Sequence, residues 1–137
     1  MTNRIIKFRA WLEKSKQMVE VSDIHFDTGL AGAKAPEGTE LHLVDKLGYI
    51  SFPFGERANS LTQFTGLTDK NGVEIYEGDV VEEKPTLKRW YVDFYSYGFC
   101  KRDIIGGDAG NIKNLSNYDV LEVIGNIYQD SHLLEKK

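Results

Sequence analysis

Apolar and polar positions alternate with a period of two along much of this chain, which is typical of β-strands whose two faces meet different surroundings. The first such stretch is 5–11, in which Ile6 and Phe8 fall on the same face. The polar run 13–17 interrupts the alternation and 18–21 resumes it. We therefore predict a β-hairpin at the start of the chain.

The pattern is weaker in the next segment. Residues 30–39 are rich in Ala, Gly and Lys and have neither period, so we expect a loop or a weak, irregular strand. Pro53 confines any strand around it to the edge of a sheet, because proline has no N–H to donate. The polar segment 54–60 is the best candidate for a boundary between two subdomains. Short strands are predicted at 24–26, 40–44 and 48–54.

The stretch 63–83, QFTGLTDKNGVEIYEGDVVEE, predicts strand, turn, strand, turn, strand. Asn71-Gly72 is a strong hairpin signal, since a type I′ turn needs positive φ at both central residues. Gly78 marks a second turn before the extended residues Val80 and Val81. This stretch indicates architecture and contains no reaction chemistry of its own.

The segment 90–100, WYVDFYSYGFC, has the strongest strand composition in the chain. Trp90 and Val92 alternate with Tyr91 and Asp93, so bulky side chains occupy both faces. Such a strand lies centrally in a sandwich or barrel, or presses one face on a partner. Gly98 is expected to mark a bulge or bend.

The remainder of the chain predicts a glycine-rich loop within 104–114, a last long strand at 121–127 and a short helical turn that begins at Asp130-Ser131. Because no long amphipathic helix is indicated, the predicted fold is mainly β, with at most short helical turns. We predict two small β-units. Residues 1–59 form an N-terminal β-meander and residues 60–137 an SH3-like barrel, or both combine in one compact unit.

Composition limits the functional classes. The 137 residues are 41% apolar and 28% charged, which is typical of a globular protein. The net charge of −4 gives no general attraction to nucleic acid or to anionic membranes. The one cysteine, Cys100, allows no intrachain disulfide and is expected to be a small buried apolar residue in a reducing cytosol. No apolar run has the length of a signal peptide or a membrane span.

Three stretches together resemble the YopX family of phage and prophage proteins: 6–11 followed by Met18, 63–81, and 123–128 leading to Leu133-Leu134. The resemblance implies a mostly β protein that forms homo-oligomers in the cytoplasm of a bacterial host cell. It implies no established biochemical activity and supplies no catalytic residues. The segments 30–57 and 84–114 match the family pattern least.

Metal and cofactor sites are not indicated. If the acidic segment is read as a calcium loop that begins at Asp69, Gly72 falls at the fourth position, whereas an EF-hand requires glycine at the sixth. The three histidines have no ligand spacing. The glycines within 106–110 lack the Lys-Ser/Thr ending of a phosphate loop. We therefore expect no cofactor and no bound metal.

One basic and aromatic stretch, 88–102, is a candidate contact surface. Small β-barrels that bind single strands place cations along the backbone and stack bases on aromatic rings. The competing interpretation is that these rings are core or subunit interface and the cations lie at solvated strand ends. The candidate residues are Lys88, Arg89, Trp90, Tyr91, Tyr95, Tyr97, Lys101 and Arg102, with Phe99 beside them.

The first functional hypothesis is a non-enzymatic phage accessory protein that assembles with itself and binds a phage or host protein, without membrane contact. The alternative is a module that binds single-stranded nucleic acid through 88–102. An enzyme that combines Glu77 and Asp79 with a distant histidine is the weakest hypothesis, because an aspartate and a glutamate beside a glycine more often order a turn.

Overall fold

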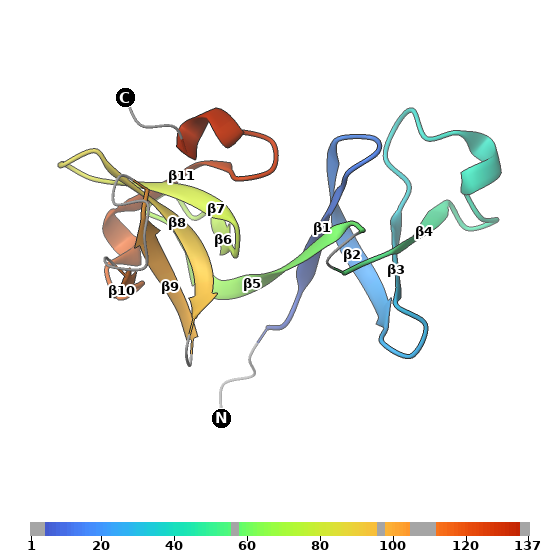
Figure 1. Cartoon of the computed structure of the whole chain (residues 1–137), viewed down its shortest axis with the longest axis horizontal. Helices are drawn as coiled ribbons and strands as arrows, with labels where there is room; N and C mark the ends of the chain where they lie inside the picture. Colours follow the sequence, from blue (N-terminus) through green and yellow to red (C-terminus); the bar gives the residue numbers. More distant parts are fainter. Residues whose placement is uncertain (1–4, 56–57, 96–97, 105–111, 135–137) are drawn as a thin grey trace. The chain divides into compact units, whose positions relative to one another are not determined.

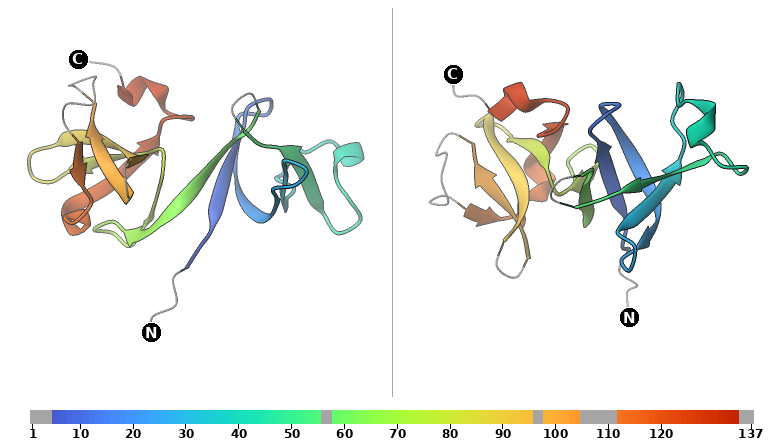
Figure 2. Two further views of the ribbon diagram at one scale, coloured as in Figure 1. Left: turned by 60° about the horizontal axis from the view of Figure 1, so that its bottom comes forward. Right: turned by 45° about the vertical axis from the view of Figure 1, so that its right-hand side comes forward.

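The computed structural model describes residues 5–55, 58–95, 98–104 and 112–134, and it is mainly β, as predicted (Figures 1 and 2). Its strands form two antiparallel sheets, of six strands in the order β4-β3-β2-β1-β5-β6 and of five in the order β10-β9-β8-β7-β11. Within these described ranges, no helix is long and apolar enough to cross a membrane.

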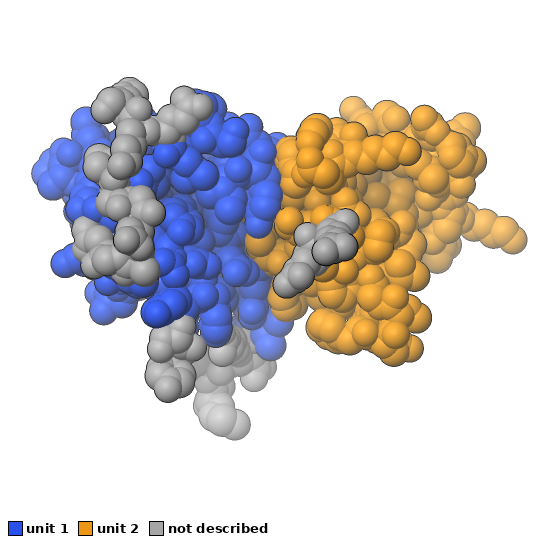
Figure 3. All heavy atoms as spheres, viewed as in Figure 1, with its two compact units in different colours: residues 1–6, 63–137 blue, residues 7–62 orange. Residues whose placement is uncertain are grey.

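The chain divides into two compact units, residues 7–62 and residues 1–6 with 63–137 (Figure 3). The division falls inside one strand, β5 (Ser60–Thr68), which begins in one unit and continues in the other. The predicted boundary between residues 59 and 60 stays a prediction.

The unit 7–62 contains β1 (Phe8–Leu12), β2 (Gln17–His25), β3 (Leu30–Lys34), η1 (Leu41–Leu43), β4 (Tyr49–Pro53) and the start of β5. β1 and β2 form the predicted hairpin, with Trp11 opposite Met18. A separate third strand at 24–26 is wrong, because β2 passes a register irregularity between Val21 and Asp23 and continues to His25. Apolar side chains of β1–β4 form the core of this unit: Ala10, Leu12, Val19, Ala31, Ala33 and Phe52.

The strand predicted at 40–44 is also wrong. This segment forms the 3₁₀ turn η1, in which the N–H of Leu43 bonds to the carbonyl of Glu40 and that of Val44 to the carbonyl of Leu41. None of the residues 40–44 is buried, so the apparent alternation reflects no buried face. β4 is the edge strand, as Pro53 predicted.

The unit that contains 63–137 has β6 (Glu74–Tyr76), β7 (Asp79–Glu83), β8 (Lys88–Tyr95), β9 (Gly98–Asp103), β10 (Ile112–Asn114), η2 (Tyr118–Val120), β11 (Leu121–Asn126) and η3 (Ser131–Leu134). The last strand and the C-terminal helical turn agree with the sequence, and the loop predicted within 104–114 falls largely outside the described residues. In the described part of the chain the five-stranded sheet does not close into a barrel. The SH3-like form of this unit stays a prediction. Its core consists of Ile75, Val81, Trp90, Val92, Leu115 and Leu121.

The hairpin predicted at Asn71-Gly72 is present, but its turn type is not the predicted one. Gly72 has φ of 80°, whereas Asn71 does not have positive φ, as a type I′ turn would require. The carboxylate of Asp69 accepts hydrogen bonds from the N–H groups of Asn71 (2.8 Å) and Val73 (2.9 Å). This side chain stabilises a longer turn with a single left-handed residue.

The single strand predicted at 90–100 is two strands. β8 and β9 form an antiparallel pair with Tyr95 opposite Gly98, so the chain reverses between them. Gly98 begins the second strand and marks no bulge in the first. The aromatic residues hid this reversal, because they continue in the sequence from Trp90 to Phe99, past the end of the first strand.

Candidate functional site

The candidate residues of 88–102 divide between the two faces of the β8–β9 pair. Residues directly opposite each other share a face, so the pairs Val92–Lys101 and Tyr91–Arg102 assign the faces. Lys88, Trp90 and Lys101 lie on the face that carries the core, and Arg89, Tyr91, Tyr95 and Arg102 lie on the other. Tyr97 is outside the described residues. The structure therefore does not bring the seven described candidates into one surface.

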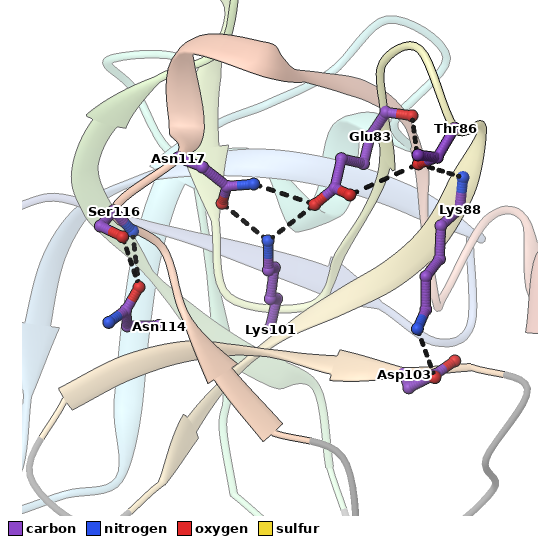
Figure 4. A network of polar contacts seen from close by, with 8 residues as sticks. All are labelled: Glu83, Thr86, Lys88, Lys101, Asp103, Asn114, Ser116 and Asn117. Carbon is purple, nitrogen blue, oxygen red and sulfur yellow. Dashed lines mark hydrogen bonds and ion pairs between the residues drawn. The ribbon is translucent and has the colours of Figure 1, made fainter.

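On the core face, Lys101 is buried in a polar network (Figure 4). Its side chain is 4% exposed, and its Nζ donates to Glu83 Oε1 at 3.0 Å and to Asn117 Oδ1 at 2.7 Å. Asn117 Nδ2 also donates to Glu83 Oε1, at 2.9 Å. The hydrogen bond from Lys101, assisted by that from Asn117, lowers the pKa of Glu83 below its ordinary value. The network thus favours the charged form of Glu83.

Trp90 lies beside this network and is 2% exposed. The Nζ atoms of Lys88 and Lys101 lie 4.5 and 4.7 Å from its ring centroid, within the range of cation–π attraction. Lys88 also pairs with Asp103 at 3.0 Å. The buried indole N–H of Trp90 has no hydrogen-bond partner among the described residues. Since this ring is buried and in contact with two ammonium groups, it is not available to stack on a base.

A cavity of about 420 Å³ opens at this network. Its lining comes from β7, β8, β9, β10 and the turn that follows β10, and most of its side chains are hydrogen-bond donors. The lining residues are Glu83, Lys88, Trp90, Lys101, Lys113, Asn114, Ser116 and Asn117.

On the opposite face, the cations of the predicted patch are paired with carboxylates. Arg102 Nε donates to Asp93 at 2.7 Å, and its guanidinium lies 5.0 Å from the ring centroid of Tyr95. Arg89 pairs with Glu82 at 3.3 Å. The hydrogen bond to Asp93 raises the pKa of Arg102. These pairs leave little unbalanced positive charge for a phosphate backbone.

The other sequence candidates serve structural roles. Asp79 is 1% exposed and accepts the N–H of Tyr76 at 2.8 Å, which orders the turn at Gly78. Burial raises the pKa of Glu77. Cys100 is buried, as predicted, and burial raises the pKa of its thiol. In the described ranges, no group of three or more metal-ligating side chains is gathered.

The sequence did not identify a second surface, around η1. Leu41, Leu43 and Leu47 are 89%, 56% and 83% exposed. Beside them is a cavity of about 560 Å³, between the β1–β2 turn and the segment that leads into η1. Its apolar lining includes Leu12, Leu43, Ile50 and Phe52, and its charged lining includes Lys14, Glu37 and Glu40. We name Leu41, Leu43, Leu47 and this cavity the η1 surface. The sequence signal for this surface was the presence of several leucines in a segment otherwise rich in polar residues. The strand prediction at 40–44 interprets two of them, Leu41 and Leu43, as one face of a strand.

Comparison with known proteins identifies relatives of this chain. Its structure is similar to the crystal structure of protein EF1440 from Enterococcus faecalis, with a TM-score of 0.63 and 25% identity, covering 97% of this chain and 100% of that one. It is also similar to protein YopX from Bacillus subtilis, with a TM-score of 0.48 and 17% identity, covering 96% of this chain and 97% of that one. The curated proteins contain no match. The model of the family described as YopX protein matches residues 7–135, and the chain therefore belongs to the YopX family, as the three resembling stretches predicted.

Proposed function

We propose that this protein is a phage or prophage accessory protein that acts by binding and not by catalysis: it assembles with itself and contacts a phage or host protein. The observation that carries the proposal is the η1 surface, where three leucines are between 56% and 89% exposed. Exposed apolar side chains beside a cavity are typical of interaction sites.

We expect a second copy of this chain to bind at the η1 surface. A two-fold symmetric dimer uses the same patch on both subunits, so the patch must be complementary to itself. The lining of the cavity includes the basic residue Lys14 and the acidic residues Glu37 and Glu40. A patch with both charge signs around an apolar centre can pair with its own copy.

Light scattering coupled to size exclusion tests self-assembly. We expect the wild-type protein to elute as an oligomer at micromolar concentration and the double variant Leu41→Asp, Leu47→Asp to elute as a monomer. Both side chains are more than 80% exposed, so the variant should keep the wild-type unfolding midpoint. Leu87→Asp, at another exposed leucine, is the matched control and should leave the oligomer intact.

A wild-type protein that is monomeric throughout the micromolar range would contradict self-assembly. An oligomer that survives the double variant would remove the η1 surface from the proposal. The partner is sought by pull-down from the bacterial host, with and without infection, where the double variant serves as the comparison.

Binding of single-stranded nucleic acid is the second candidate. The observation in its favour is that Phe94 and Tyr95, at the end of β8, are 51% and 52% exposed, as base-stacking rings would be. The pairing of Arg89, Lys101 and Arg102 with carboxylates favours the first candidate instead.

A further inference from the structure

The cavity beside Trp90 has the chemistry of an anion site. Three ammonium groups, those of Lys88, Lys101 and Lys113, line it against the single carboxylate of Glu83, so the lining has a net charge of two positive. Asp103, which pairs with Lys88 without lining the cavity, reduces the local charge to one positive. This excess stands out in a chain whose net charge is −4.

The lining also presents hydrogen-bond donors that the network does not use. Lys101 Nζ has three N–H bonds, and its two hydrogen bonds go to Glu83 and Asn117. Asn114 accepts the hydroxyl and the N–H of Ser116 through its Oδ1, which leaves the amide N–H groups of Asn114 as donors. The buried indole N–H of Trp90 has no partner within the described residues. Because Trp90 lines the cavity, a ligand bound there changes the surroundings of this N–H, which makes it a reporter of binding.

The one acceptor-rich group in the cavity is already occupied. Glu83 accepts hydrogen bonds from Lys101 and Asn117 and also contacts Thr86. A ligand that brings acceptors and negative charge fits this lining, whereas a cation or a hydrogen-bond donor does not. The volume of about 420 Å³ lies in the range of small-molecule pockets, roughly 300–1,000 Å³.

We propose that this cavity binds a small molecule that carries one phosphate ester group, with Lys101, Lys113 and the side-chain amide of Asn114 as donors to the phosphoryl oxygens. A phosphate monoester carries a charge of about −1.5 to −2 near pH 7 and offers three strong acceptor oxygens. Both properties complement the lining. This site lies in the unit that contains 63–137 and is independent of the η1 surface, so failure of either proposal leaves the other standing.

The two tryptophans make a direct test with the full-length protein. In a ¹⁵N spectrum Trp11 and Trp90 each give one indole N–H peak, and the Trp11 N–H already donates to Glu13 at 2.9 Å, in the other unit. We expect titration with ribose 5-phosphate to move the Trp90 peak saturably while the Trp11 peak stays fixed. Ribose, the uncharged counterpart, should move neither peak. Inorganic phosphate should move the Trp90 peak more weakly than the ester does.

Lys113→Gln tests the charge of the site, because Lys113 is exposed and the change removes one ammonium from the cavity. We expect binding to weaken roughly tenfold, as for loss of one charged hydrogen bond. Lys70→Gln, at an exposed lysine of the same unit outside the cavity, is the matched control and should bind as the wild type does.

The proposal is overturned if the Trp90 peak does not respond to millimolar ribose 5-phosphate. It is also overturned if ribose moves that peak equally, or if Lys113→Gln and Lys70→Gln bind alike. A response to inorganic phosphate that equals the response to the ester supports the phosphoryl site but overturns recognition of the rest of the molecule.

Discussion

At the scale of single residues, hydrogen bonds between distant parts of the chain decide what the polar side chains do. Asp69 illustrates this: besides ordering its own turn, its second oxygen accepts the N–H of Val123 at 2.8 Å. The same carboxylate thus holds a hairpin and β11 together. An acidic residue in a turn was predictable from sequence, but its second partner, which is 54 positions away, was not.

Glu83 gives a prediction at this scale. Because the pKa of Glu83 is lowered in the folded state, the ion pair with Lys101 stabilises the protein fully at pH values above the ordinary pKa of a glutamate. This stabilisation is lost as the pH falls through the lowered pKa of Glu83. Glu83→Gln should lower the free energy of unfolding at neutral pH by about 2 kcal/mol, because Lys101 stays buried without its carboxylate.

Chemical denaturation at pH 7 and in acid measures this effect. The difference between Glu83→Gln and the wild type should shrink as the pH falls through the lowered pKa of Glu83, where the wild-type carboxyl also becomes protonated. Asp119→Asn, at an exposed acid of the same unit, is the control and should change stability by less than about 0.5 kcal/mol. A difference for Glu83→Gln that does not depend on pH would contradict the assigned role.

At the scale of elements, the sequence predicted the β1–β2 hairpin and β11 correctly, and in both cases the strands contribute side chains to an apolar core. The prediction was wrong at Glu40–Val44, where apolar and polar residues alternate although none of them is buried, and at 90–100, where a run of aromatic residues continues from one strand into the next. The network of Glu83, Lys101 and Asn117 was not predictable, because only the folded chain brings these residues together. Asn117 is 16 positions from Lys101 and 34 positions from Glu83 in the sequence.

Gly125 in β11 gives the prediction for this scale. The register of β11 against β7 shifts between Val123 and Gly125, and a Cβ atom at Gly125 would lie 2.8 Å from Leu133 Cδ1 and 2.5 Å from Asp130 Oδ2. Gly125→Ala should therefore displace the turn around η3 and lower the free energy of unfolding by about 1–3 kcal/mol.

Gly72→Ala is the matched comparison for Gly125→Ala, measured in the same thermal or chemical denaturation. A Cβ at Gly72 would meet no atom within 4 Å, but its φ of 80° disfavours alanine, so a loss of about 1 kcal/mol is expected from the backbone alone. Measured by hydrogen exchange, the amides near η3 should lose protection in the Gly125 variant and keep it in the Gly72 variant. Equal protection in both would show that the contact with η3 is unimportant.

At the scale of the whole molecule, charge limits the partners. The net charge is −4, and the cations of the 88–102 stretch that the structure describes, Lys88, Arg89, Lys101 and Arg102, each pair with a carboxylate. Binding to a phosphate backbone would have to break such pairs without a basic surface to compensate. The sequence shows which residues of this stretch are cationic and which are aromatic. It could not show how they divide between the two faces of the β8–β9 pair.

We therefore expect no measurable binding of labelled single-stranded DNA or RNA at about 50 mM salt, where counterion release makes such binding strongest. Fluorescence anisotropy measures it, with a basic single-strand-binding protein as the positive control. Affinity that falls steeply as salt rises would contradict this expectation and favour the alternative function. In that case Phe94→Ala and Tyr95→Ala would identify whether the exposed rings of β8 are the contact.

The division inside β5 affects how the protein is made. Residues 7–62 leave the ribosome before residues 63–137, and every residue of the first apolar cluster lies within 7–62. Translation at roughly 5–20 residues per second leaves about 4–15 s in which that cluster can form before the second unit is available. β5 has its partner β1 when this interval begins, and β6, which starts six residues after β5 ends, is made early in the interval. The first half of the strand can then act as a template from which the second unit begins to fold.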